Sequence, residues 1–215
     1  MPHGANRETI MNNRSVTFDI AQLFKDSWEL FKRNMSPLLG GYLIAMVIIS
    51  VSGAVYIGPL ILSGPLVLGL FKMSRMAVRG ESIEFSELFS GFQRFLDAFL
   101  ANLIITIFTI AGSILCIIPG LLVGIAYMST YLFMLDDKLA FWDAMEASRK
   151  MVMNNPVQWI ILWLVLCLFN IVGVLACCAG LILTGPISLL VLTLAYDAER
   201  RAVIEVVAVP VEPSA

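Results

Sequence analysis

Three long apolar blocks constrain what this chain can fold into. They cover residues 37–71, 98–135 and 157–196, and each is about 35–40 residues long, whereas one membrane-spanning helix needs only about 20. Glycine and proline interrupt each block near its middle, at 52–59, 117–120 and 177–180. We therefore interpret each block as two spans joined by a tight turn, which predicts six spans.

The composition agrees with a membrane protein. Apolar residues make up 59% of the chain and charged residues 14%, against about 45–50% and about 25% in soluble domains. The net charge of −2 gives no sign of a nucleic-acid partner. The single histidine, His3, and the lack of any CxxC or Cys/His spacing predict no metal site and no cofactor.

The basic residues predict the orientation of the spans. With six spans, all 14 Lys and Arg fall on one side of the membrane, and the three turns on the other side carry no charge. Loops that keep Lys and Arg are cytoplasmic. We therefore expect a bacterial cytoplasmic-membrane protein with both termini in the cytoplasm. The four basic groups are Arg7, Arg14, Lys25, Lys32 and Arg33; Lys72, Arg75, Arg79 and Arg94; Lys138, Arg149 and Lys150; and Arg200 and Arg201.

The predicted architecture is an all-α polytopic membrane helix bundle. The membrane domain covers 17–200, between a disordered leader (1–16) and a disordered tail (201–215) in which 203–209 looks strand-like without a partner strand. No secretory signal precedes the first apolar run, which we expect to act as an uncleaved anchor. Because the turns are so apolar, hairpins that re-enter without crossing are the alternative to full spans. The predicted spans are 37–57, 58–78, 96–117, 119–135, 156–177 and 179–197.

A unit of one short helix and one hairpin occurs three times in this pattern. The first and third units align without a gap at an offset of 121, which matches Ser27 to Ser148 and Asn34 to Asn155. The middle unit has the same order of elements but needs gaps. Since the orientation is the same each time, a pseudo-threefold arrangement about the membrane normal is expected.

The short helices before the hairpins are predicted to be amphipathic. The first carries an apolar stripe of Ile20, Phe24, Trp28 and Phe31, together with Leu23, at helical spacing. Such helices lie in the membrane interface, where they either cover the end of the bundle or dock a cytoplasmic protein partner. The residues proposed for contact with headgroups or a partner are Trp28, Arg33, Arg94, Arg149 and Lys150.

Two Gly-Pro pairs suggest a ligand site. Gly64–Pro65 and Gly185–Pro186 lie within spans 2 and 6, where proline removes a helical hydrogen bond. Matched breaks in corresponding repeats point to a transporter's binding site. The alternative is that the turn reaches this far and proline starts the returning helix.

Span 3 carries a polar stripe whose members are spaced four, three and four residues apart: Asn102, Thr106, Thr109 and Ser113. Such groups must face protein or water, so the stripe either lines a ligand path or links helices by hydrogen bonds. Asn170 in span 5 is a candidate partner for the stripe. Arg94 and Asp97, at the entry of span 3, are expected to form an interface ion pair.

Signatures of catalysis are missing from the sequence. There is no HExxH, GxSxG or P-loop motif, and Asp136 is interpreted as a cap or loop residue, so we expect no enzyme. The cysteines are interpreted as small buried hydrophobes, unless Cys116 meets Cys177 or Cys178 at an oxidising face and forms a disulfide.

One run of motifs resembles a known family. It comprises Trp28, GlyPro (64–65), LeuPheSerGlyPhe (88–92), IleIleProGly (117–120), Tyr127, LeuAsp (135–136), Ala144 with Ser148, GlyPro (185–186) and Tyr196. Over roughly residues 17–200 the chain resembles a bacterial family of uncharacterised six-span integral membrane proteins. It is similar also to the membrane domain fused to some glycerophosphodiester phosphodiesterases. The resemblance implies the topology, and it implies no phosphodiesterase activity, since that domain is missing from the sequence.

The sequence therefore leaves two functions open. In the first, the bundle binds or transports a lipid or small apolar solute through the Gly-Pro breaks and the polar stripe. In the second, the protein is a membrane adaptor that docks a cytoplasmic partner through its amphipathic helices. Both place the chain in the lipid bilayer.

Overall fold

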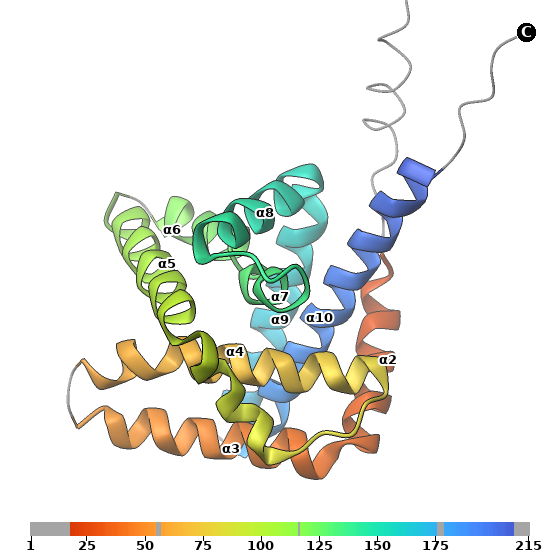
Figure 1. The fold of residues 1–215 in the computed structure, drawn as a ribbon. Coiled ribbons are helices and arrows are strands. Elements are labelled where there is room, and N and C mark those ends of the chain that lie inside the picture. The colour runs from red at the N-terminus through yellow and green to blue at the C-terminus, as the bar shows by residue number, and fades with distance from the viewer. Residues whose placement is uncertain (1–17, 55–56, 116, 176–178, 209–215) are drawn as a thin grey trace, which may run out of the picture.

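The computed structural model describes residues 18–54, 57–115, 117–175 and 179–208, and every element assigned in these ranges is a helix (Figure 1). The cysteines considered for a disulfide, Cys116, Cys177 and Cys178, lie outside the described residues. In chain order the elements are α2 (Ile20–Arg33), α3 (Met35–Ser52), α4 (Gly58–Arg79), η1 (Phe85–Arg94), α5 (Phe95–Leu115), α6 (Ile117–Ala126), α7 (Thr130–Asp136), α8 (Phe141–Asn154), α9 (Pro156–Leu175) and α10 (Ala179–Ala208).

Six helical stretches in the described ranges are long and apolar enough to cross a membrane, which confirms the all-α class and the number of spans. By length and composition the stretches are Met35–Ser52, Gly58–Arg79, Phe85–Ile114, Pro119–Asp136, Pro156–Leu175 and Gly180–Arg201. The residues at the helix ends explain where some of these helices begin and end. Pro156 begins α9, where its missing N–H costs nothing, and Gly80 ends α4 with a left-handed φ of 72°.

The fourth span differs from the continuous helix expected over 119–135, because it is divided into α6 and α7. The break coincides with a side chain from α8. Ser148 Oγ donates to the carbonyl oxygen of Ala126 at 2.8 Å and accepts from the backbone N–H of Ser129 at 3.3 Å. A buried hydroxyl thus satisfies backbone groups on both sides of the break, which apolar surroundings would otherwise penalise.

The disorder expected from residue 201 also differs from the structure over 201–208, whereas 209–215 lie outside the described residues. Helix α10 runs without interruption to Ala208. Extension of a helix that is already packed costs little, since each added residue contributes a backbone hydrogen bond. Residues 203–208 therefore continue the helix that precedes them, although their alternating sequence pattern is typical of a strand.

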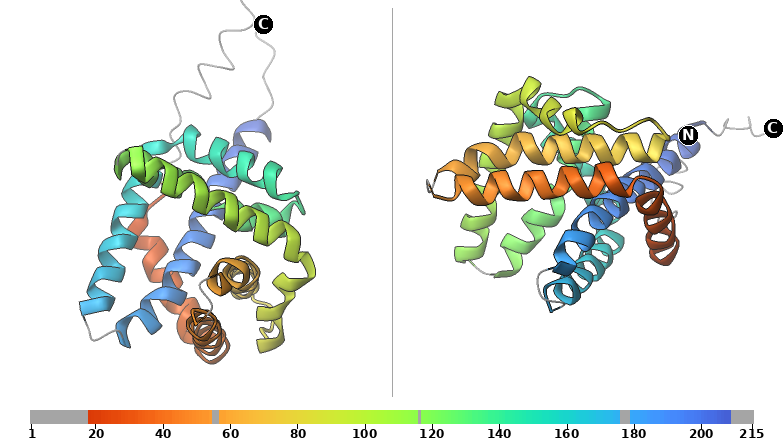
Figure 2. Two further views of the ribbon diagram at one scale, coloured as in Figure 1. Left: turned by 90° about the vertical axis from the view of Figure 1, so that its left-hand side faces the viewer. Right: turned by 90° about the horizontal axis from the view of Figure 1, so that it is seen from below.

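The three hairpins cross one another steeply and do not stand parallel. In Figure 1 the α3–α4 hairpin runs across the picture, whereas α9 and α10 run steeply upward behind it. The two views in Figure 2 show the same crossing, and the ends of the three hairpins are spread apart. The three hairpins contact one another near the ends that lie away from their turns.

Each short helix packs on the returning helix of the preceding hairpin. Helix η1 packs on α4, α8 packs on α6 and α7, and α2 packs on α10. The last contact joins the first described helix to the last, so the three units close into a ring. This order of packing is consistent with a threefold scheme, and the sequence repeat itself stays a prediction.

The buried face of α2 is shifted from the expected stripe. Leu23, Ser27 and Phe31 are buried, whereas Trp28 is 47% exposed and stacks beside Phe31. The stripe from Ile20 to Phe31 therefore marks one edge of the packed face and not its centre.

Glycines set the close crossing of α4 and η1. A Cβ atom at Gly91 would collide with the carbonyl oxygen of Pro65, and one at Gly69 would collide with that of Leu88. Leu88 itself is fully buried. The LeuPheSerGlyPhe motif (88–92) therefore has a packing explanation, since its glycine lets two backbones meet.

We predict that Gly91→Ala lowers the thermal unfolding midpoint of the purified protein, because the added methyl group must separate the two backbones. The expected cost is about 1–3 kcal/mol. The matched control is Gly124→Ala in α6, where a Cβ atom meets no other atom within 4 Å. That variant is expected to be neutral or slightly stabilising through its helix propensity. Equal midpoints for the two variants would contradict the packing role of Gly91.

Candidate functional site

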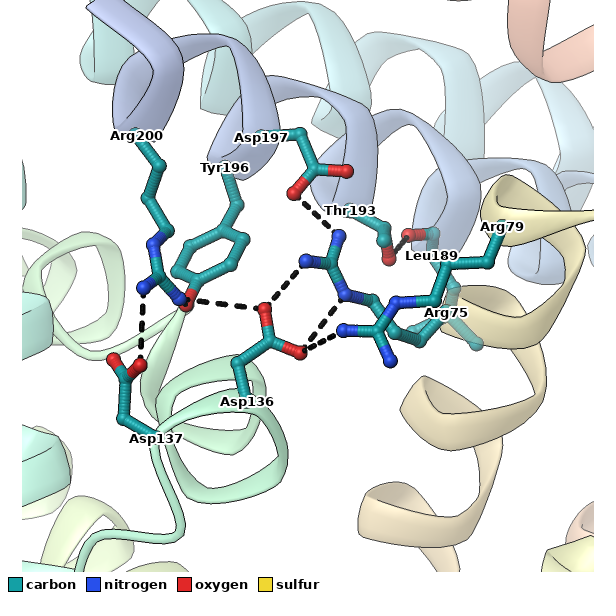
Figure 3. Close-up of polar contacts among 9 residues, drawn as sticks. All are labelled: Arg75, Arg79, Asp136, Asp137, Leu189, Thr193, Tyr196, Asp197 and Arg200. Atoms are coloured by element: carbon teal, nitrogen blue, oxygen red, sulfur yellow. Dashed lines mark hydrogen bonds and ion pairs between the residues drawn. The ribbon is translucent and has the colours of Figure 1, made fainter. Parts of the chain in front are cut away.

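A charged cluster joins one returning helix from each hairpin (Figure 3). Arg75 on α4 donates from Nε to Oδ1 of Asp136 at 3.0 Å and from Nη2 to its second carboxylate oxygen. Its remaining Nη1 group donates to Asp197 on α10. A planar guanidinium is suited to such forked pairing, so one side chain holds α4, the end of α7 and α10 together.

Two further arginines complete the cluster. Arg79 donates to Asp136 at 2.9 Å. Arg200 donates to Asp137 at 3.0 Å and to the hydroxyl oxygen of Tyr196 at 2.7 Å. The ring of Tyr196 is fully buried, with the guanidinium groups of Arg75 and Arg200 at 5.6 and 5.5 Å from its centre, within the range of cation–π attraction.

The centre of the cluster is shielded from water. The side chains of Arg75, Asp136 and Asp197 are 12%, 7% and 15% exposed. Burial of charged groups is costly unless they are paired and hydrogen-bonded. The three charged groups of this cluster meet both conditions. The cluster lines a cleft of about 490 Å³ that Arg201 also lines, so four arginines face three aspartates there. All three aspartates are paired with arginines of the cluster. We interpret it as a clamp between helices.

This cluster is not among the sites predicted from the sequence, in which Asp136 is interpreted as a cap or loop residue and Arg75 only indicates the orientation of the spans. Asp136 does lie at the end of α7, but its carboxylate accepts from α4 and α10. The available signal was the occurrence of acids at the ends of spans 4 and 6 and of an arginine at the matching depth of span 2.

A second site is an apolar groove, which we define as the cleft of about 390 Å³ between α3, α4, α9 and α10. Two of the residues predicted from sequence line it, Asn170 and Gly185. Asn170 donates to Ser188 Oγ at 2.9 Å and to the carbonyl oxygen of Leu166 at 2.8 Å. The groove thus has one polar pair in an apolar wall. It is lined by Tyr42, Val67, Leu70, Trp163, Leu166, Cys167, Asn170, Gly185, Ser188, Leu189 and Leu192.

The Gly-Pro pairs lie inside helices, so the alternative in which proline starts the returning helix is wrong. Pro65 is inside α4 and Pro186 is inside α10. Both glycines serve close packing, since a Cβ atom at Gly64 would collide with the carbonyl oxygen of Ala98 and one at Gly185 with the ring of Tyr42. Only Gly185 also borders the apolar groove.

The polar stripe of span 3 joins neighbouring helices and lies away from the groove. Asn102 donates to Ser63 Oγ on α4 at 2.9 Å, and Thr106 donates back to the carbonyl oxygen of Asn102 at 2.7 Å. Thr109 and Ser113 lie against Gly120 of α6. Asn170 pairs with Ser188 and not with this stripe.

The five residues proposed for headgroup or partner contact lie on three elements, α2, η1 and α8. Trp28 and Arg33 are exposed on α2, and on α8 Lys150 is exposed and Arg149 is partly exposed. The expected ion pair of Arg94 with Asp97 is confirmed at 2.8 Å.

Glu146 compensates the charges of α8. Its carboxylate accepts from Arg149 at 2.7 and 2.8 Å and lies 3.5 Å from the ammonium of Lys150. Its hydrogen bond with Arg149 lowers the pKa of Glu146 to about 2, so the carboxylate is ionised at neutral pH. With Asp143 on the same helix, α8 carries two acids and two cations and so presents a balanced surface more than a basic one.

The fold and these sites define a multi-pass α-helical membrane protein. Over 97 residues the chain is 29% identical to Uncharacterized protein Mb2590 of Mycobacterium bovis and to Uncharacterized proteins MT2637 and Rv2560 of Mycobacterium tuberculosis. The match covers 45% of this chain but only 30% of the length of each relative. No family model and no solved structure matches the chain. Within the described residues, no three His, Cys, Asp or Glu side chains are grouped to hold a metal ion.

We predict that Arg75→Gln strongly destabilises the protein, because it leaves Asp136 and Asp197 buried without their shared partner. Breaking a buried pair in this way costs on the order of 3 kcal/mol. The measurement is the midpoint of thermal unfolding in detergent. The control is Arg149→Gln, which breaks an exposed pair on α8 and is expected to cost less than about 1 kcal/mol. If both variants unfold at the wild-type temperature, the cluster is not a clamp.

Proposed function

We propose that this protein binds a lipid or small apolar solute in the apolar groove and moves it within or across the bacterial cytoplasmic membrane, without catalysing a reaction. The observation that carries the proposal is the groove itself. Its volume falls in the range of small-molecule sites, and apolar walls with a few fixed polar groups are characteristic of such sites.

The polar groups of the groove support an amphiphilic ligand. Asn170 and Ser188 are positioned by bonds to the backbone of their own helices, since Asn170 donates to Leu166 and Ser188 donates to Thr184. The amide oxygen of Asn170 can accept a hydrogen bond from a ligand hydroxyl or amide. In a low-dielectric groove one such bond would orient a mostly apolar molecule.

The proposal also includes the orientation of the protein in the membrane and its resemblance to a family. The confinement of all Lys and Arg to one set of segments supports cytoplasmic termini. The mycobacterial relatives carry no description of an activity. The resemblance to six-span bacterial membrane proteins is compatible with the six spans, and it supports the topology more than the ligand.

A second candidate function, an adaptor, is favoured by the exposed aromatic residues of the short helices. Trp142 at the start of α8 is 57% exposed, on the same helix as Arg149 and Lys150. Exposed aromatic and arginine side chains are enriched in protein interfaces. A cytoplasmic protein could dock there while the groove stays unused.

We predict that Leu189→Trp, which fills the groove, reduces by about tenfold the amount of lipid or apolar solute retained through native purification. The measurement is mass spectrometry of molecules bound to the purified protein. The matched control is Leu164→Trp, since Leu164 is exposed on α9 but does not line the groove. Equal retention by the two variants would reject the groove as the binding site.

The adaptor alternative makes a different prediction. Reversal of both charges, Arg149→Glu with Lys150→Glu, should remove a co-purifying cytoplasmic protein while the unfolding midpoint changes little. The control reverses two exposed charges on α2, Lys25→Glu with Lys32→Glu. If the same proteins co-purify with both double variants, docking through this part of α8 is excluded.

A further inference from the structure

A cleft on the other face of α4 has a different chemistry from the apolar groove. It measures about 370 Å³ and lies between α4, η1, the end of α7 and the segment that follows α7. Its polar lining residues are Lys72, Ser90, Gln93, Arg94 and Lys138, and no acid lines it. We call this cleft the basic cleft. It contrasts with the charged cluster, where aspartates face the arginines.

Arg94 is held rigidly at the wall of the basic cleft. It donates to the carbonyl oxygens of Met134 and Leu139 at 2.6 Å each and to Asp97 at 2.8 Å. These bonds join the end of η1 to α5, to α7 and to the segment that follows α7. The position of one cation is therefore fixed before any ligand arrives, which lowers the entropic cost of binding.

Lys72 and Lys138 bring ammonium groups to the same cleft. Lys72 pairs with Glu87 at 2.6 Å, and since an ammonium has three N–H donors, one contact leaves donors for a ligand. Lys138 has a φ of 52°, the one positive value among the non-glycine residues that the structure describes. No ion pair is formed by Lys138 within the described part of the chain.

The balance of charge indicates the class of ligand. Glu87 and Asp97 compensate two of the three cations, so the charge of Lys138 is in excess. A phosphodiester carries a single negative charge and accepts several hydrogen bonds, and Arg and Lys are the side chains that bind phosphate best. Ser90 and Gln93 add neutral polar groups to the same lining.

We propose that the basic cleft binds a phosphate group, either the headgroup of an anionic phospholipid or a free phosphate ion. The lipid source is favoured by the surroundings, since Phe85, Phe89 and Phe95 are exposed on η1 and at the start of α5. Aromatic side chains beside basic ones are characteristic of the headgroup region. This site is independent of the apolar groove, because Leu68 and Lys72 of α4 face the cleft and Val67 and Leu70 face the groove.

The test is a native mass-spectrometry titration of the full chain in a neutral detergent. Separate arms use phosphatidylglycerol, phosphatidylcholine and inorganic phosphate. We expect one saturable phosphatidylglycerol site that weakens as salt is raised, with weaker binding of zwitterionic phosphatidylcholine. Displacement of the lipid by millimolar inorganic phosphate would assign the site to free phosphate, and lack of displacement would assign it to a lipid headgroup. Either result supports a phosphate site.

Two variants of Lys138 separate binding from folding. Lys138→Gly removes the charge and suits the left-handed backbone, so its unfolding midpoint should equal or exceed that of the wild type while its affinity falls about tenfold. Lys138→Arg keeps the charge and should keep most of the affinity. Lys150→Gln, on α8, is the control for a general loss of positive charge.

The groove variant Leu189→Trp should leave this affinity unchanged, which separates failure of this site from failure of the groove. Wild-type affinity for both phosphatidylglycerol and inorganic phosphate in Lys138→Gly would overturn the proposal. So would the same loss of affinity in Lys150→Gln.

Discussion

The pairing of Arg75 with Asp136 and Asp197 holds the structure together at one point. The three hairpins cross steeply and spread apart, so contact between their far ends cannot fix their relative positions. One guanidinium from α4 instead reaches the returning helices of the other two hairpins. The cost of burying these charges is offset only while all three are present, which couples the positions of α4, α7 and α10.

Helix α4 therefore positions two chemically different surfaces. The apolar groove lies on one face, and the basic cleft, with Lys72 at its wall, lies on the other. Close glycine contacts restrict the helix on the side of the basic cleft, since Gly64 meets α5 and Gly69 meets η1. Movement of α4 would therefore change the shape of both clefts together.

The sequence predicts the parts of this structure that depend on local chemistry. Long apolar runs, proline and glycine interruptions and the placement of Lys and Arg predict the six helical spans. The pairing of Arg75 with Asp136 could not be predicted, because it joins residues 61 positions apart whose meeting depends on how the hairpins cross. The division of α6 from α7 could not be predicted for the same reason, since the side chain that satisfies the break, Ser148, lies on another helix. The shifted face of α2 likewise reflects its packing on α10, which helical periodicity alone does not contain.

The contact of α2 with α10 also has a consequence for biogenesis. A ribosome delivers α2 before α10, so α2 emerges long before its packing surface exists. Phe31 and Leu23, which the finished fold buries, must stay in the lipid interface or on a chaperone until α10 has been made. Contact between α2 and α10 therefore requires that the spans between them have already been synthesised.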